Sequence, residues 1–277
     1  PYWEEALRRD AGDVRVNTAM GIRLLKKARY AAAEKHLRKA LDRLTAQYTA
    51  PKDGEPMYYL GLALEAQGKI DEAFASFYRA TWSAAWRGAA YFELAEIDCR
   101  RGDFTAAAEH LERSLESNAL NLRAWNLLAS IRRHQGRVAE AIEILQTMAR
   151  RIDPLDVRSM AERWLATGAA RDAQPLVATL QAHPAAIEET AAEYLDAGLW
   201  EDGLKVLRQW VESAVDREDA AQSQGSSLGR VNRQAPPLPA LSPAVRGGEG
   251  GRRPGEGEAG RTPPMPYYYM AYFAGKL

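Results

Sequence analysis

The stretch YYLGLALEAQGKIDEAFASFYRA, residues 58–80, decides the fold that this sequence predicts. Two further stretches repeat its pattern, YFELAEIDCRRGDFTAAAEHLERS at 91–114 and WNLLASIRRHQGRVAEAIEILQTM at 125–148. Each stretch has apolar residues at helical spacing, then a glycine followed by a polar residue, then a second amphipathic run. The pattern predicts a helix, a short turn and an antiparallel second helix in every unit.

Small residues keep one register across these units. The turn glycines Gly68, Gly102 and Gly136 are 34 residues apart, a period that is typical of stacked helical hairpins. Two antiparallel helices approach closely where one of them carries a small side chain, so we expect Gly61 to face Ala73. The repeat-packing positions are Gly21, Gly61, Ala95 and Ala129 in the first helices, and Ala33, Ala73, Ala107 and Ala141 in the second helices.

This pattern resembles the tetratricopeptide repeat. Within residues 58–80, the positions that carry the resemblance are Leu60, Gly61, Ala73, Phe77 and Ala80. The resemblance implies an all-α fold, an α-solenoid of antiparallel helix pairs wound into a right-handed superhelix. We expect 1–13 to end a preceding repeat and 14–217 to form about six helix pairs, at 14–47, 54–87, 88–121, 122–153, 154–183 and 184–217.

A change in composition marks the end of this array. Residues 222–266 hold eight of the fourteen prolines and nine of the twenty-one glycines, and they contain no aromatic residue. Such a segment buries too little apolar surface to offset its conformational entropy. We therefore predict a disordered insertion at 218–266, in which PPLPALSP is either part of a linker or a ligand for a domain that binds polyproline helices. Residues 267–277 would then form the first helix of a truncated further repeat.

The resemblance also implies a binding surface, because members of this family commonly bind partners in an inner groove lined by the first helices. The groove positions include Arg100 and Arg123, and the candidate binding residues are Tyr58, Leu62, Phe92, Glu96, Asn126 and Arg133. Some members grip a peptide carboxylate with Lys and Asn. Thr18 and Ile22 occupy those positions here, so we do not expect that kind of clamp.

Trp82 and Trp86 lie close together where one unit ends and the next begins. Tryptophan buries a large area at low entropic cost, so it serves packing and recognition equally well. Three interpretations stay open for this pair: packing between repeats, docking of a partner domain, and stacking on a ligand such as a sugar.

Composition excludes several classes of function. The chain has 277 residues, with 37 Lys and Arg against 37 Asp and Glu, so it lacks a bulk positive field for nucleic acid. No apolar run reaches the ~20 residues that span a bilayer. The four histidines are scattered, Cys99 is the single cysteine, and no phosphate-binding loop is present. We therefore assign no catalytic, cofactor-binding or metal-binding residue, and we do not expect an enzyme.

Two expectations concern the context of the chain. It begins at Pro1 rather than Met, so we expect a fragment or a processed chain. The single cysteine fits a reducing compartment, which favours the cytoplasm.

A narrower resemblance comes from ATWSAAWRGAAYFELAE at 80–96, RIDPLDVRSMAERWLATG at 151–168 and AAEYLDAGLWEDG at 191–203. These stretches are similar to the C-terminal repeat region of large bacterial proteins that carry an upstream galactose-mutarotase-like β-sandwich domain of unknown function. The resemblance implies a non-catalytic scaffold for protein or interdomain contacts, whose partner is its own upstream domain, a second copy or a peptide. The alternative is an accessory module of a carbohydrate-active enzyme, with carbohydrate bound through the upstream domain or at the tryptophans.

Overall fold

The computed structural model describes residues 2–46 and 53–225, with the backbone alone for 214–225. Within these residues the chain forms thirteen helices and no strand. The helices are α1 Tyr2–Arg9, α2 Val14–Leu25, α3 Tyr30–Thr45, α4 Glu55–Glu65, α5 Ile70–Ala80, α6 Arg87–Arg100, α7 Phe104–Ser117, α8 Leu122–His134, α9 Val138–Arg151, α10 Val157–Thr167, α11 Ala170–Ala182, α12 Ala186–Asp196 and α13 Trp200–Gly225.

The turn glycines end the first helix of each pair. Gly102 has a φ of +78° and Gly136 a φ of +77°, a conformation that residues with a side chain rarely adopt. Ala28 takes the same left-handed conformation, with a φ of 55°, between α2 and α3, at a cost of about 1–2 kcal/mol. Side-chain caps then start the following helices: the Asp103 carboxylate accepts a hydrogen bond from the backbone N–H of Ala106 at the start of α7.

The glycines of the first helices allow the two helices of a pair to lie close together. A Cβ atom placed on Gly61 would lie 2.4 Å from the ring of Phe77, and one on Gly21 would lie 2.5 Å from Leu37. Gly61 therefore lies against the Phe77 ring, and its expected contact with Ala73 stays a prediction. Ala73 itself is fully buried beside this contact, as are the other repeat-packing residues.

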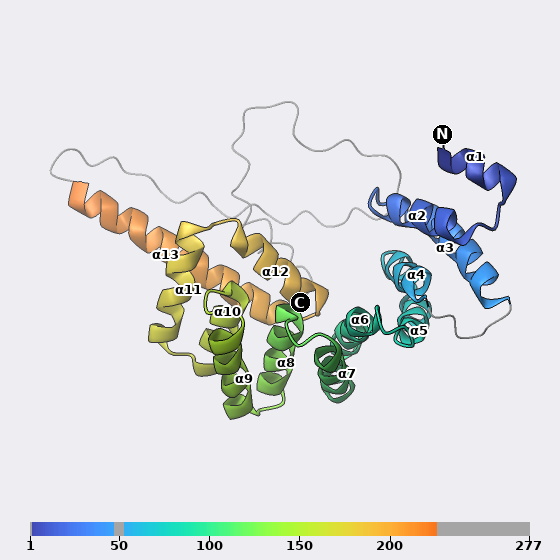
Figure 1. Ribbon diagram of the computed structural model, residues 1–277. Helices are drawn as coiled ribbons and strands as arrows, with labels where there is room; N and C mark the ends of the chain where they lie inside the picture. Colours follow the sequence, from blue (N-terminus) through green and yellow to red (C-terminus); the bar gives the residue numbers. More distant parts are fainter. Residues whose placement is uncertain (1, 47–52, 226–277) are drawn as a thin grey trace.

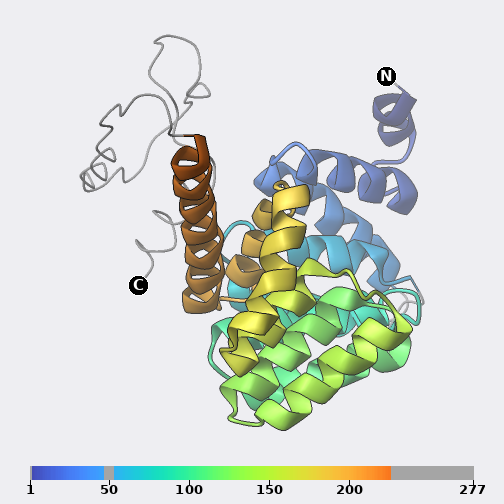
Figure 2. The same ribbon diagram turned by 90° about the vertical axis from the view of Figure 1, so that its left-hand side faces the viewer.

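The helix pairs follow one another along an arc, with α4, α6, α8 and α10 on its inner side and α5, α7, α9 and α11 on its outer side (Figure 1). Successive pairs pack closely at the contacts of α3 with α4, α5 with α6 and α7 with α8. The last pair departs from this rule, because α12 packs little against α11 and lies on the inner side of the arc instead. Figure 2 shows the long helix α13 standing beside the stacked helices rather than extending the stack.

The end of the array also differs from the expected boundary. Helix α13 runs from Trp200 to Gly225, so helical backbone continues eight residues beyond the point at which the insertion was expected to begin. The Pro- and Gly-rich tract after Gly225 and the expected helix at 267–277 lie outside the described residues.

Candidate functional site

The inner faces of α6, α8 and α10 form a groove, which we name the covered groove because residues 193–202 fill it. These residues are the end of α12, the following turn and the start of α13, and we name them the C-terminal corner. Tyr194 of the corner is fully buried, with the guanidinium carbon of Arg158 3.2 Å from the centre of its ring. Burial of the ring and this cation–π contact anchor the corner in the groove.

Three further arginines on α6 and α8 contact the corner. Arg100 donates a hydrogen bond of 2.5 Å from Nη1 to the backbone carbonyl of Asp196. Arg133 pairs with Asp202 through Nη2 at 2.5 Å, and the same carboxylate lies 2.7 Å from Nε2 of His134. Because Asp202 is only 1% exposed in its side chain, this interaction is a buried, multiply hydrogen-bonded ion pair rather than a surface contact.

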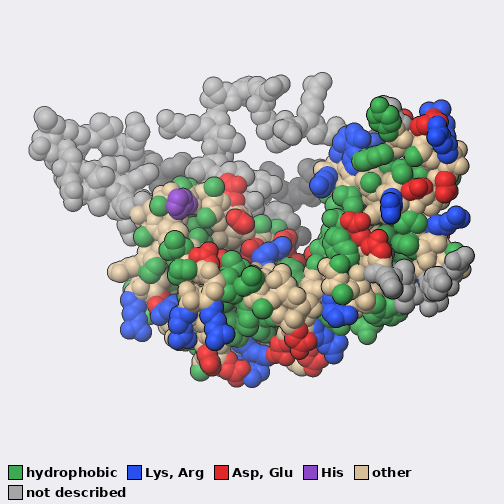
Figure 3. Space-filling view, viewed as in Figure 1, with side chains coloured by type: hydrophobic (Ala, Val, Ile, Leu, Met, Phe, Trp, Pro, Cys, Tyr) green, Lys and Arg blue, Asp and Glu red, His purple; other side chains and the backbone are tan. Residues whose placement is uncertain are grey.

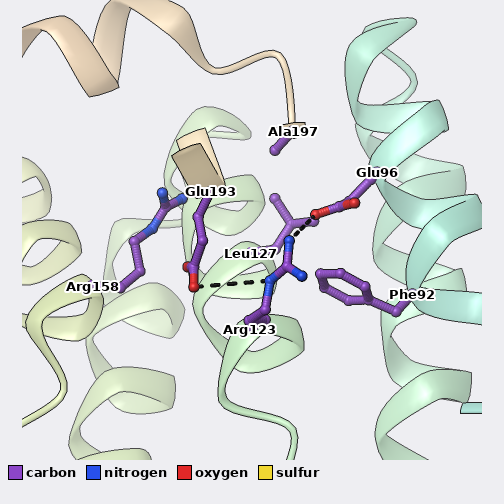
Figure 4. A pocket seen from close by; sticks show the side chains of 7 residues that line it. All are labelled: Phe92, Glu96, Arg123, Leu127, Arg158, Glu193 and Ala197. Carbon is purple, nitrogen blue, oxygen red and sulfur yellow. Dashed lines mark hydrogen bonds and ion pairs between the residues drawn. The ribbon is translucent and has the colours of Figure 1, made fainter. Parts of the chain in front are cut away.

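Arg123 joins the two sides of the groove (Figure 4). Its Nη2 donates a 3.0 Å hydrogen bond to Glu96 of α6, while its Nε lies 3.9 Å from Glu193 of α12. Its guanidinium carbon is 4.9 Å from the centre of the Phe92 ring. The cavity between these side chains has a volume of about 10 Å³, which is about the space that one water molecule requires.

The pKa values of the carboxylates in this site shift in opposite directions. It raises the pKa of Glu96 well above the ordinary range, and the nearby charge of Glu93 raises it further. Burial also raises the pKa of Glu193, although Arg158 and Arg123 partly oppose that shift. Burial alone would raise the pKa of Asp202 too, but hydrogen bonds from His134 and Arg133 outweigh it and hold that pKa well below the ordinary range. Asp202 is thus the firmly ionised anchor of the corner.

The structure places four of the six candidate groove residues inside the covered groove. Phe92 is 5% exposed, Glu96 6% and Asn126 2%, and the side chain of Arg133 is 12% exposed. The chain's own last helix pair covers Phe92, Glu96 and Arg133, whereas Asn126 is hydrogen-bonded to Asp156 and Ser159 at the start of α10. Their role in binding a partner stays a prediction. Arg158 and the acidic corner were not recognised from the sequence, since the 34-residue register is lost after 153.

Tyr58 and Leu62, the other two candidates, lie on α4 outside the covered groove and are half-buried. The hydroxyl of Tyr58 donates a 2.8 Å hydrogen bond to Glu93, and the Tyr58 ring stacks on Trp86 at 4.9 Å between centroids. Trp86 thus packs against the helix pair before it. Trp82, by contrast, is 51% exposed.

Two features are absent from the described residues. In that part of the chain, no group of three or more His, Cys, Asp or Glu side chains is arranged to hold a metal ion. Of the helices in 2–46 and 53–225, none is long and apolar enough to cross a membrane.

Solved structures with the same arrangement of helices share little sequence with this chain. The C-terminal part of a TPR repeat-containing protein from Cytophaga hutchinsonii matches 82% of this chain and 93% of its own length, with a TM-score of 0.58 and 12% identity. The pilF protein of Pseudomonas aeruginosa matches 66% of this chain and 82% of its own, with a TM-score of 0.55 and 16% identity.

A third structure is that of YrrB, described as a TPR protein with an unusual peptide-binding site. It matches 68% of this chain and 97% of its own length, with a TM-score of 0.53 and 15% identity. At these identities the likeness concerns the fold alone.

The model of the tetratricopeptide repeat family matches residues 18–90 and 92–157. These ranges contain the helix pairs α4/α5, α6/α7 and α8/α9, with their turn glycines and buried small residues. They amount to half of the chain, and the chain therefore belongs to the tetratricopeptide repeat family.

Proposed function

We propose that this chain is a protein-binding scaffold whose first repeats present the open part of its inner face. One observation carries this proposal: Ile22 of α2 and Tyr58, Tyr59 and Leu62 of α4 remain partly exposed on neighbouring inner helices, whereas the corner covers the repeats that follow. Figure 3 shows that the surface is hollowed on this side, between the first repeats and the last helices. Partly exposed aromatic and aliphatic side chains in a concave surface are typical of sites that bind protein segments.

The family supports the same proposal, because stacked helical hairpins present extended concave surfaces to their partners. YrrB offers a parallel, since it is described as having a peptide-binding site. For this chain, the partner would be a peptide, a second copy or a neighbouring domain of a larger bacterial protein. We assign no catalytic residue to the scaffold.

A photo-crosslinking residue placed at position 62 tests this function in living cells. We expect discrete crosslinked species that disappear when Ile22→Glu is added, because a buried charge would disrupt an apolar contact. The matched control carries the same photo-crosslinker at Lys35, an exposed position on α3. Identical crosslinks from positions 62 and 35 would contradict the proposal.

The alternative of a glycan-contacting accessory module is tested at Trp82, the exposed tryptophan. Glycan-array binding that Trp82→Ala abolishes would favour it over the protein-binding scaffold.

A further inference from the structure

The junction between the last two helix pairs differs from the earlier junctions of the stack. At the earlier junctions, the second helix of one pair packs closely on the first helix of the next, as α5 does on α6. At the last junction α12 packs little on α11, and residues 183–185 connect the two helices. The last pair is therefore held by the packing of α13 on α11 and of α12 on α10, together with the contacts of the corner in the groove.

The corner contacts the groove as a bound helical ligand would. It supplies one buried aromatic ring, Tyr194, which lies against Arg158 of α10, and acidic side chains that face two arginines of α8. The acidic partners are Glu193 and Asp196 beside Arg123, and Asp202 beside Arg133. An aromatic anchor surrounded by complementary charges is the usual composition of a specific recognition site.

This self-contact leaves part of the groove unsatisfied. Arg158 is 4% exposed, and its Nη2 donates a hydrogen bond of 3.2 Å to Ser130. Its Nη2 also lies 3.5 Å from Oε1 of Glu162, whereas its Nε and Nη1 atoms are buried without a hydrogen-bond partner, which is unfavourable for these two donors. Glu96 and Glu193 also line the same small cavity, and burial raises the pKa of both. A ligand with an acidic or carbonyl oxygen near Arg158 would satisfy the groove better than the corner does.

We propose that the covered groove is a binding site for an acidic, tyrosine-bearing helix of a partner protein, and that the C-terminal corner occupies this site until the partner displaces it. The inference rests on the proposed scaffold function and adds a second site to it, with a defined ligand chemistry. The partner's arginine and ring contacts would replace those of the corner, and the partner's greater affinity for the groove would drive the exchange.

The test uses the full chain and a fluorescent peptide that copies residues 188–206. Tyr194→Ala with Asp202→Asn removes the two anchors that hold the corner in place. We expect this opened chain to bind the peptide at least ~10-fold more tightly than the unaltered chain, because the competing segment is weakened. Adding Arg158→Ala to the opened chain should lower binding ~10-fold or more, and a peptide that lacks its tyrosine and carboxylates should not bind.

A disulfide provides a second variant in case the opened chain does not fold. A Cβ atom at position 198 would lie 3.4 Å from the Cβ of Arg100, close to the separation in a disulfide. Arg100→Cys with Gly198→Cys, in a Cys99→Ala background, should lock the corner in the groove. The oxidised form is expected not to bind the peptide, and reduction is expected to restore the binding seen without the lock.

Two results would overturn this inference. One is a folded, opened chain that does not bind the peptide, which would make the corner a structural terminus only. The other is a stable dimer of the opened chain that the peptide does not dissociate, since a second copy would then be the occupant. Crosslinking through position 62 is independent of the lock, so failure of the scaffold proposal and failure of this inference are distinguishable.

Discussion

The first repeats and the last helix pair are built from the same motif but are held in different ways. In α4 and α5 the contact is apolar, with the Phe77 ring against the bare face of Gly61. The ion pair between Arg38 of α3 and Glu72 of α5 lies on the surface, with 44% and 55% of the two side chains exposed. In the last pair the ion pair between Arg133 and Asp202 is 12% and 1% exposed. The first repeats are thus held by close apolar packing, whereas the corner combines an aromatic anchor and the buried Leu199 with buried charge.

Tyr194→Ala should have the largest effect among the variants that test this difference. Removal of a fully buried aromatic side chain should cost about 3–5 kcal/mol, and the loss should be confined to α12 and α13, because they are held by the corner. Hydrogen exchange measured helix by helix would show faster exchange there and unchanged exchange in α4 and α5. Tyr78→Ala is the control, since Tyr78 is 46% exposed. Faster exchange throughout the chain would mean that the two regions are a single cooperative unit.

Gly61→Leu tests the apolar contact between α4 and α5. The new side chain would meet the buried Phe77 ring at under 3 Å, so we expect a loss of about 3 kcal/mol from overpacking. Thermal unfolding measures this loss, and Ala66→Leu, at an exposed position after the same helix, should leave the melting temperature nearly unchanged. An unaltered melting temperature for Gly61→Leu would show that α4 and α5 do not pack in this register.

Asp202→Asn separates buried charge from surface charge. It should cost about 2 kcal/mol at neutral pH, because Arg133 and His134 lose an ionised partner. The folded pKa of Asp202 is held below its ordinary value of 3.8. The stability that the charge contributes is therefore present above pH 3.8 and is lost as the pH falls through the depressed folded pKa.

Urea unfolding at a series of pH values measures the effect of Asp202→Asn. Asp71→Asn is the control, because that side chain is 98% exposed although it pairs with Arg101. If both variants lose the same amount at pH 7, buried charge does not hold the corner.

Glu93→Gln should have the smallest effect and the opposite sign. Burial raises the pKa of Glu93 to about 7, although the hydrogen bond from Tyr58 partly opposes the shift. A carboxyl pKa that is higher in the folded state stabilises that state at low pH. This stability is lost as the pH rises from 4.5, the ordinary pKa of a glutamate, toward 7, the folded pKa of Glu93.

The Glu93→Gln variant should therefore be more stable than the unaltered protein by about 1–2 kcal/mol at pH 8, and this difference should disappear near pH 4.5. Unfolding of both proteins at these two values measures the difference. Glu116→Gln, at an exposed position on α7, is the control and should show no such dependence on pH. An equal effect of Glu93→Gln at both pH values would contradict the assignment.

The sequence by itself determined the helix pairs and their turns. Helical periodicity and the need for glycine at a positive φ are local properties, so Gly102 and Gly136 mark their turns without reference to the rest of the chain. The buried small residues were predictable for the same reason, because they recur in one register.

Only the tertiary structure decided which surfaces stay open. Arg133 and Asp202 are 69 residues apart in the sequence, and Arg100 and Asp196 are 96 apart. Contacts over such separations follow no repeat period and therefore leave no pattern in a single sequence. Phe92 and Glu96 stand at groove positions in the sequence, but the last helix pair folds back on its own array and covers them. There, a tyrosine and three carboxylates meet four arginines.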